Sequence, residues 1–207
     1  MLEYNEYLSD YEWVPAKFSG QPFLNNPDLV VIHSGAFGEG VAEYFANPGD
    51  NRKASAHFCW SKERDCFVQQ VSLRNEAMHA GGSKFAGDRR RVNLRSIGIE
   101  LPGPWNQNPR SNNQRELLRN LLDDLKYEIP SLKYLTGHQF IDPTNRKDPG
   151  PGVDVSWFEG LGYTVAWYDC RQSINNRSKE TSSKNTLYTE GSEEVCDSSD
   201  SEDYYKY

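Results

Sequence analysis

Long apolar runs are absent from this 207-residue sequence. No stretch approaches the roughly 20 consecutive apolar residues that a membrane-spanning helix requires. The N-terminus, MLEYNEYLSDYEW, has neither the basic region nor the apolar region of a secretory signal peptide. We therefore expect no membrane contact, a protein that is cytoplasmic at synthesis, and release by another route if it acts on a cell wall.

Cysteine is also scarce, with four in the chain and no C-x-x-C pair, which argues against a cysteine zinc ribbon. The H-E-x-x-H helix motif of many metallohydrolases is missing as well. Cys59 and Cys66 flank the segment WSKERD, and two interpretations stay open for them. They form a disulfide across a hairpin if the protein meets an oxidising space. In a chain without an export signal, two reduced thiols are the expectation.

The net charge of −7 is concentrated at the C-terminus, because residues 190–207 contain seven acidic residues and one lysine and so carry −6 of it. The remaining domain is close to neutral, so we expect no general nucleic-acid binding, although Arg89–Arg91 and Arg95 form a local basic patch. Residues 172–207 are rich in Ser, Asn and acidic residues, which predicts a disordered tail. Docking of an unknown partner protein and simple solubilisation stay open as its role.

Apolar segments that predict strands and helices alternate along the chain. The predicted strands cover 28–35, 55–60, 66–72, 94–103 and 133–138, the second and third forming a hairpin. The predicted helices cover 38–50 and 111–130, and Leu117, Leu118, Leu121, Leu122 and Leu125 recur at helical spacing in the second. Alternation of this kind indicates an α/β fold. We expect a single domain over residues 1–171, with a central mixed β-sheet flanked by helices, followed by the tail at 172–207.

Two histidines and an aspartate lie where functional sites are commonly built. His33 and His138 each end a predicted strand and precede a loop, and Asp148 lies in the stiff segment FIDPTNRKDPGPG. Two imidazole nitrogens and one carboxylate oxygen match the three protein ligands of a catalytic zinc, which leaves a fourth position for water. The spacing alone fits two structural histidines equally well, so both interpretations stay open at this point.

Five sequence blocks occur in the order in which one enzyme family has them. They are VVIHSG, SAHF, MHAGGS, RSIGIELPGPW and GHQFIDPTNRKDPGPG. From about Leu29 to Trp157 the chain resembles the zinc-dependent N-acetylmuramoyl-L-alanine amidases. This family includes bacterial anhydro-muropeptide amidases, phage amidases and peptidoglycan recognition proteins.

The resemblance implies a zinc site with a catalytic carboxylate. His33, His138 and Asp148 match the family's three zinc ligands, and Glu100 matches the carboxylate that works beside the metal-bound water. Zinc lowers the pKa of water from ~15.7 to about 7 and polarises the amide carbonyl. Glu100 would then accept the water proton and pass it to the leaving amine. The alternative for Glu100 is a salt-bridged carboxylate without a catalytic role.

The resemblance also implies roles for four residues around the metal. Arg146 takes the place of a lysine that many members have two residues before the third ligand, where a cation could stabilise the oxyanion. Arginine differs from lysine in reach and geometry, so a loop with Lys147 turned inward is the alternative. His79 matches a position at the substrate groove, and His57 matches a structural or groove-lining one. We therefore take His79, His57 and Lys147 as candidate substrate-binding residues.

The implied activity is hydrolysis of the amide between N-acetylmuramic acid and L-alanine, with Zn²⁺ as cofactor and peptidoglycan or a muropeptide as partner. The expected setting is a phage-endolysin-like enzyme that lyses the cell wall. An intracellular enzyme that recycles muropeptides is the alternative. A module that binds peptidoglycan without hydrolysis is the alternative from another class. The presence of all three ligand types and of Glu100 favours the enzyme.

Overall fold

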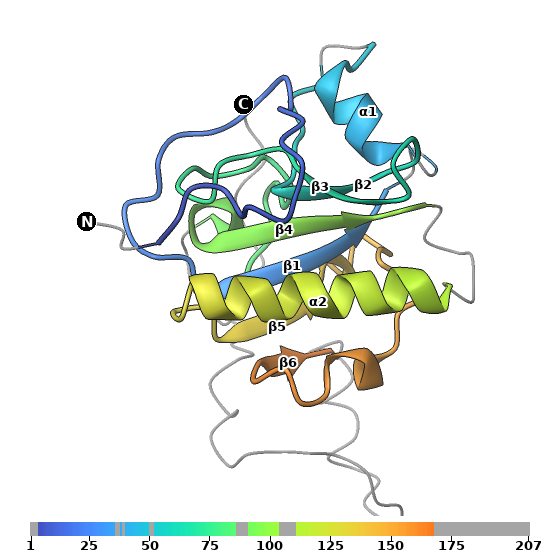
Figure 1. Ribbon diagram of the computed structural model, residues 1–207. Coiled ribbons are helices and arrows are strands. Elements are labelled where there is room, and N and C mark those ends of the chain that lie inside the picture. Colours follow the sequence, from blue (N-terminus) through green and yellow to red (C-terminus); the bar gives the residue numbers. More distant parts are fainter. Residues whose placement is uncertain are drawn as a thin grey trace, which may run out of the picture.

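A computed structural model describes residues 4–35, 38, 40–49, 52–85, 91–103 and 111–167. Their backbone builds one six-stranded sheet in the order β3-β2-β4-β1-β5-β6 (Figure 1). The strands are β1 (Leu29–Ser34), β2 (Phe58–Ser61), β3 (Cys66–Gln69), β4 (Ser96–Leu101), β5 (Tyr134–Gly137) and β6 (Thr164–Ala166). All neighbours pair in parallel except β2 and β3, which form an antiparallel hairpin, so the sheet is mixed as predicted. The tail at 172–207 and Arg89–Arg90 lie outside the described residues.

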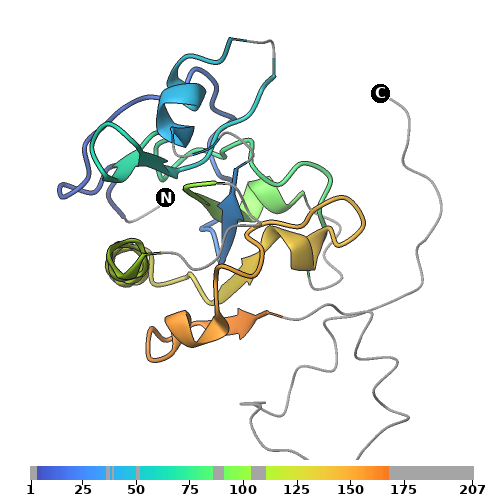
Figure 2. The same ribbon diagram turned by 90° about the vertical axis from the view of Figure 1, so that its right-hand side faces the viewer.

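Helices cover both faces of this sheet. They are α1 (Val41–Ala46), α2 (Asn112–Glu128) and α3 (His138–Ile141), with the short 3₁₀ helices η1 (Val92–Arg95) and η2 (Val155–Phe158). Figure 2 shows α2 end-on at one side of the central strands, with η1 and α3 at the other. The predicted α/β class with flanking helices is therefore confirmed. No helix within the described ranges is long and apolar enough to cross a membrane.

The long helix α2 begins at a capping box formed by Ser111 and Gln114. The Ser111 hydroxyl accepts a hydrogen bond from the Gln114 N–H at 3.1 Å, and the Gln114 side chain accepts one from the Ser111 N–H. Four of the five predicted leucines are fully buried against the sheet, at positions 118, 121, 122 and 125. The helix therefore forms by amphipathic packing on one face of the sheet.

Successive side chains of a strand point to opposite faces of the sheet, so their order decides which ones face α2 and which ones face away from it. Val30 and Ile32 of β1 and Ile99 of β4 pack with the leucines of α2 in one core cluster. Because side chains of a strand alternate between faces, His33 and Glu100 point to the opposite face. One face of the sheet, under α2, is therefore aliphatic. The other face carries the polar candidate site residues His33 and Glu100.

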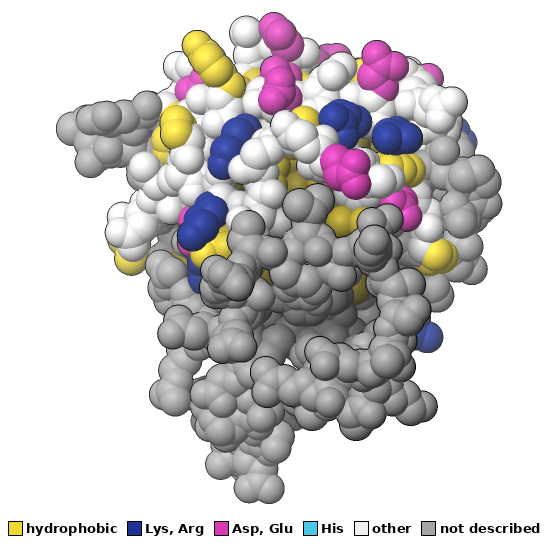
Figure 3. All heavy atoms as spheres, turned by 90° about the horizontal axis from the view of Figure 1, so that it is seen from below, with side chains coloured by type: hydrophobic (Ala, Val, Ile, Leu, Met, Phe, Trp, Pro, Cys, Tyr) yellow, Lys and Arg dark blue, Asp and Glu magenta, His cyan; other side chains and the backbone are white. Residues whose placement is uncertain are grey.

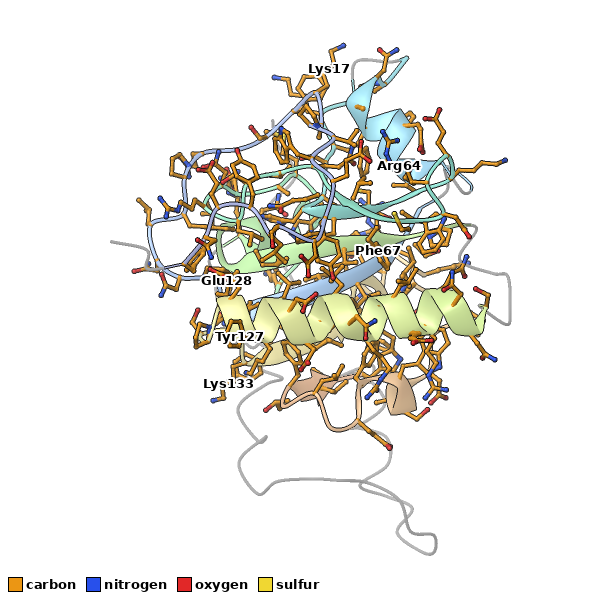
Figure 4. All side chains as sticks on the ribbon, viewed as in Figure 1. Lys17, Arg64, Phe67, Tyr127, Glu128 and Lys133 are labelled. Carbon is orange, nitrogen blue, oxygen red and sulfur yellow. The ribbon has the colours of Figure 1, made fainter. Side chains whose placement is uncertain are left out.

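The N-terminal segment, residues 4–28, closes an edge of the sheet without forming a strand of its own. The Val14 N–H donates to the Gln69 carbonyl of edge strand β3 at 2.9 Å. In the hairpin turn, Arg64 donates two hydrogen bonds to the Glu12 carboxylate, at 2.6 and 2.8 Å (Figure 4). The segment thereby covers backbone groups of β3 that would otherwise be open to pairing with another chain.

The two cysteines of the hairpin do not face each other. Cys59 pairs with Val68 and Cys66 pairs with Ser61, and both thiols are free. Cys59 is fully buried, and burial raises the pKa of its thiol well above the usual value. These positions agree with the predicted reduced thiols and not with the disulfide alternative. Cys170 and Cys196 lie beyond the described part of the chain.

Candidate metal centre

The three predicted metal ligands meet at the carboxyl end of adjacent parallel strands. His33 is the next-to-last residue of β1, and His138 follows β5 directly as the first residue of α3. The Nδ1 atoms of the two histidines lie 2.9 Å apart. Asp148 Oδ2 lies 3.1 Å from His138 Nδ1 and 3.3 Å from His33 Nδ1. Among the described residues, this set is the group of His, Cys, Asp and Glu side chains that could hold a metal ion.

Backbone contacts fix the third ligand in place. The Gln139 N–H at the start of α3 donates to the Asp148 carbonyl at 2.7 Å. Pro149 lies directly against Gly137, where an added Cβ would come within 2.7 Å of the proline Cδ. Only a residue without a side chain therefore allows the loop to fold back so closely on the end of β5.

The distances and protonation states fit a divalent metal. Ligand atoms about 2.0–2.1 Å from a tetrahedral zinc would lie about 3.3 Å from one another. The observed separations are 2.9–3.3 Å. Burial, followed by the neighbouring His138, lowers the pKa of His33 to about 4, so His33 is neutral near pH 7. Burial opposes ionisation of Asp148, but the neighbouring His138 and His33 keep its pKa well below the usual value. The forms that metal binding requires are thus already present in His33 and Asp148.

A buried carboxylate lies beside the ligands. Glu100 of β4 is the in-register partner of His33 on β1, so the two side chains lie next to each other on the same face. Glu100 is 8% exposed, and its Oε2 has no hydrogen-bond partner among the residues described. Burial raises the pKa of Glu100 well above the usual value, the charge of Asp148 raises it further, and Arg146 opposes both. An unsatisfied buried carboxylate is costly, which argues for a functional role.

The charge of Arg146 acts on the site. Its side chain is 48% exposed, and its Nε lies 3.8 Å from an Asp142 carboxylate oxygen. Its charge nevertheless lowers the pKa values of both Glu100 and His33. Lys147 is exposed. The choice between Arg146 and Lys147 for the oxyanion stays a prediction.

The N-acetylmuramoyl-L-alanine amidase family matches residues 23–151 of the chain, a range that includes the three predicted ligands and Glu100. The chain belongs to this family. The resemblance seen in the sequence, and the class of enzyme that it implied, are therefore confirmed.

Individual relatives of the amidase are similar over most of their length. The 1,6-anhydro-N-acetylmuramyl-L-alanine amidase AmpD of Enterobacter cloacae is 33% identical over 183 residues, which cover 78% of this chain and 95% of the relative. A crystal structure of an AmpD selenomethionine derivative superposes with a TM-score of 0.67 at 28% identity, covering 78% of this chain and 99% of that one. The Escherichia coli amidase AmiD, solved with an anhydro-N-acetylmuramic acid peptide, has a TM-score of 0.57 at 24% identity. It covers 75% of this chain and 64% of that one, and it shows the fold alone.

His79 contacts the predicted metal ligand His33 from the side opposite Asp148. Its Nδ1 lies 2.9 Å from His33 Nε2, and the two rings are nearly perpendicular with centroids 5.0 Å apart. The His79 ring rests on Gly98 of β4, where an added Cβ would come within 2.5 Å of the ring. A role of His79 in substrate binding stays a prediction.

His57 is held by the backbone on both ring nitrogens. Its Nδ1 accepts a hydrogen bond from the Gly98 N–H at 3.0 Å, and its Nε2 lies 2.9 Å from the Asn75 carbonyl, which can only accept. The ring is fully buried and stacks on Phe23, with centroids 6.0 Å apart. These contacts support the structural alternative for His57. The view in Figure 3 accordingly shows no histidine on the described part of that surface.

Two residues of β4 that support His79 had no role predicted from the sequence. Ser96 contacts His79, and Gly98 makes room for the His79 ring. A glycine inside a strand often marks a close approach of another group, so the signal for Gly98 was present in SIGIEL. Ser96 carried no such signal, because its contact depends on the fold bringing residues 79 and 96 together.

The hydrogen bonds of His57 generate a pH prediction for the metal-free protein. Burial lowers the pKa of His57 to about 4 from 6.5, so the stability gained from the neutral ring is complete above pH 6.5 and is lost as pH falls toward 4. A shift of this size contributes on the order of 3 kcal/mol. We expect His57→Gln, which cannot titrate, to lose less unfolding free energy than the wild type between pH 7 and pH 4 in urea titrations with a chelator.

A packing variant separates the change in pH dependence from a general loss of stability. Phe23→Leu removes the ring that stacks on His57 but leaves the titrating group, so it should lower stability while keeping the pH dependence of the wild type. An identical pH dependence in His57→Gln and the wild type would contradict the assignment.

Proposed function

We propose that this amidase is a zinc hydrolase that cleaves the amide between the lactyl group of N-acetylmuramic acid and L-alanine. The observation that carries the proposal is the convergence of His33, His138 and Asp148 beside the buried Glu100, whose Oε2 has no hydrogen-bond partner among the described residues. We further propose soluble anhydro-muropeptides as its substrates. The identity to the Enterobacter relative, which is named for a 1,6-anhydro-muramyl substrate and is covered over 95% of its length, supports this choice over intact cell wall.

The chain's own residues supply the proton transfers. When bound, zinc supplies the Lewis acidity that activates water and polarises an amide carbonyl. Glu100 accepts the proton of the attacking water and passes it to the nitrogen of L-alanine as the C–N bond breaks. Its raised pKa suits a group that must first take up a proton, because it makes the carboxylate a stronger base.

Arg146 stabilises the charge that develops on the amide oxygen. The charge of its guanidinium lowers the pKa values of Glu100 and His33, which supports a cation acting on this site. Asp142 restrains it, because the Asp142 carboxylate pairs with the Arg146 side chain and the Asp142 carbonyl accepts the Arg146 N–H at 2.9 Å. The arginine is therefore held to its own loop, two residues before Asp148.

Zinc binding provides the first test. The metal-free protein should take up about one equivalent of zinc in a titration, and His138→Ala should lose it, because one of three ligands is gone. His57→Gln is the matched histidine control and should keep full occupancy, since both His57 nitrogens bond to backbone groups away from the metal ligands. Full zinc occupancy in His138→Ala would show that the ligand set is wrong.

Amide cleavage provides the second test. We expect the zinc-loaded protein to release peptide amino groups from soluble anhydro-muropeptides without producing new reducing sugar ends, and a chelator to stop the release. Glu100→Gln should keep its zinc and lower kcat by a factor of about 10²–10⁴. Lysis of intact sacculi would instead support the endolysin-like setting. Muropeptide binding without release would move the protein to the recognition class.

Cation variants test the oxyanion assignment. Arg146→Ala should lower kcat by about 10²–10³ with a smaller change in KM, as expected for loss of a donor that acts in the transition state. Arg146→Lys should recover part of that loss. The neighbouring Lys147→Ala is the matched control, and its effect on kcat should be smaller. A larger loss in Lys147→Ala than in Arg146→Ala would assign the role to Lys147.

A further inference from the structure

A continuous series of hydrogen-bonding groups leads from the metal site to a backbone carbonyl. It runs from His33 Nε2 to His79 Nδ1 at 2.9 Å, and from His79 Nε2 to the Ser96 hydroxyl at 3.1 Å. The Ser96 hydroxyl then lies 2.6 Å from the carbonyl oxygen of Val92 in η1. Two residues, His79 and Ser96, therefore separate a proposed metal ligand from a group whose hydrogen-bonding role is fixed.

The carbonyl decides the direction of every bond in this series. A carbonyl oxygen only accepts, so the Ser96 hydroxyl donates its single proton to Val92 and can only accept from His79. His79 Nε2 must then carry a proton, which leaves a lone pair on Nδ1 of the neutral ring. That lone pair accepts from His33, so His33 carries its proton on Nε2. The Nδ1 of His33 consequently presents its lone pair toward His138 and Asp148.

The neighbouring chain holds His79 in position for this task. The Ala80 N–H donates to the Asn93 side-chain oxygen of η1 at 2.8 Å, which fixes the backbone next to His79. Gly98 leaves the space that the ring occupies on β4. Both nitrogens of His79 are engaged inside the protein, so its geometry is that of a support for His33.

We propose that His79 is a positioning residue which, through Ser96 and the Val92 carbonyl, locks His33 in the tautomer whose Nδ1 can bind the metal. The proposal rests on the zinc hydrolase proposed above, because it concerns one of its ligands. His79 lies in the block MHAGGS and Ser96 in the block RSIGIEL, so the proposal assigns both blocks to the support of His33. The other histidine ligand differs, since His138 Nε2 has no hydrogen-bond partner within the described structure. Support from the protein is thus concentrated on His33.

The tautomer of His33 can be measured without metal, substrate or turnover. In the metal-free, ¹⁵N-histidine-labelled protein, we expect long-range ¹H–¹⁵N spectra at pH 7 to show His33 with its proton on Nε2 only. Ser96→Ala removes the acceptor of His79 while leaving the His33–His79 contact in place, so it should produce a mixture of His33 tautomers. A role of Ser96 in packing alone would leave the spectrum of His33 unchanged.

Ser55→Ala is a matched control for a general loosening of the chain around His79. The buried Ser55 hydroxyl accepts the Met78 N–H at 3.0 Å, next to His79 but outside the series. Ser55→Ala should therefore leave the His33 tautomer as in the wild type. The same mixture in Ser55→Ala and Ser96→Ala would overturn the proposal, because it would show a general effect of mobility.

Zinc affinity provides the second readout. His79→Leu removes the acceptor for His33 and should weaken zinc binding by about 10–100-fold in a competition titration with a chelator, with about one equivalent still bound at saturation. His79→Asn keeps an oxygen that can replace Nδ1 as the acceptor and should recover most of that affinity.

The two readouts separate this proposal from the proposed function. Wild-type His33 with its proton on Nδ1, or unchanged zinc affinity in a folded His79→Leu, would overturn the positioning role even if the protein cleaves muropeptides. Absence of amide cleavage with the expected tautomers and zinc affinities would overturn the hydrolase and leave the role of His79 intact.

Discussion

The in-register parallel pairing of β1 with β4 is the constraint on which the site depends. It sets His33 beside Glu100, and the pairing of β1 with β5 on its other side brings His138 to the same end of the sheet. A slip of β1 by one residue would turn His33 toward α2 and place Ile32 in the site. The aliphatic contacts under α2 oppose this slip, so the core packing also maintains the position of a predicted metal ligand.

The two faces of the sheet have different roles. Under α2 the strands carry aliphatic side chains that are excluded from water, and this burial is the main source of stability. On the other face, the central strands carry His33, Glu100 and Gly98, which contribute polar groups or open space in place of apolar area. The site is therefore built on strands whose stability comes from the opposite face and from the segments that cover their edges.

Much of this arrangement could be predicted from the sequence, because its central parts have strong patterns. Strands β1, β4 and β5 are short apolar runs, α2 has a helical leucine repeat, and the amidase blocks indicated the ligands. The short elements α3 and β6 were missed, since three or four residues show no periodicity. The closure of the β3 edge by residues 4–28 was also missed, because it depends on backbone hydrogen bonds that any residue type can make.

Gly98 links two parts of the site that are otherwise separate in the sequence. Its N–H holds the His57 ring, and its missing side chain accommodates the His79 ring. Any larger residue at position 98 would collide with an imidazole at position 79, so the two positions are not independent. In related chains, we expect them to covary: a member that lacks a ring at the position of His79 is released from the need for glycine, and a member with a larger residue at 98 has lost the ring.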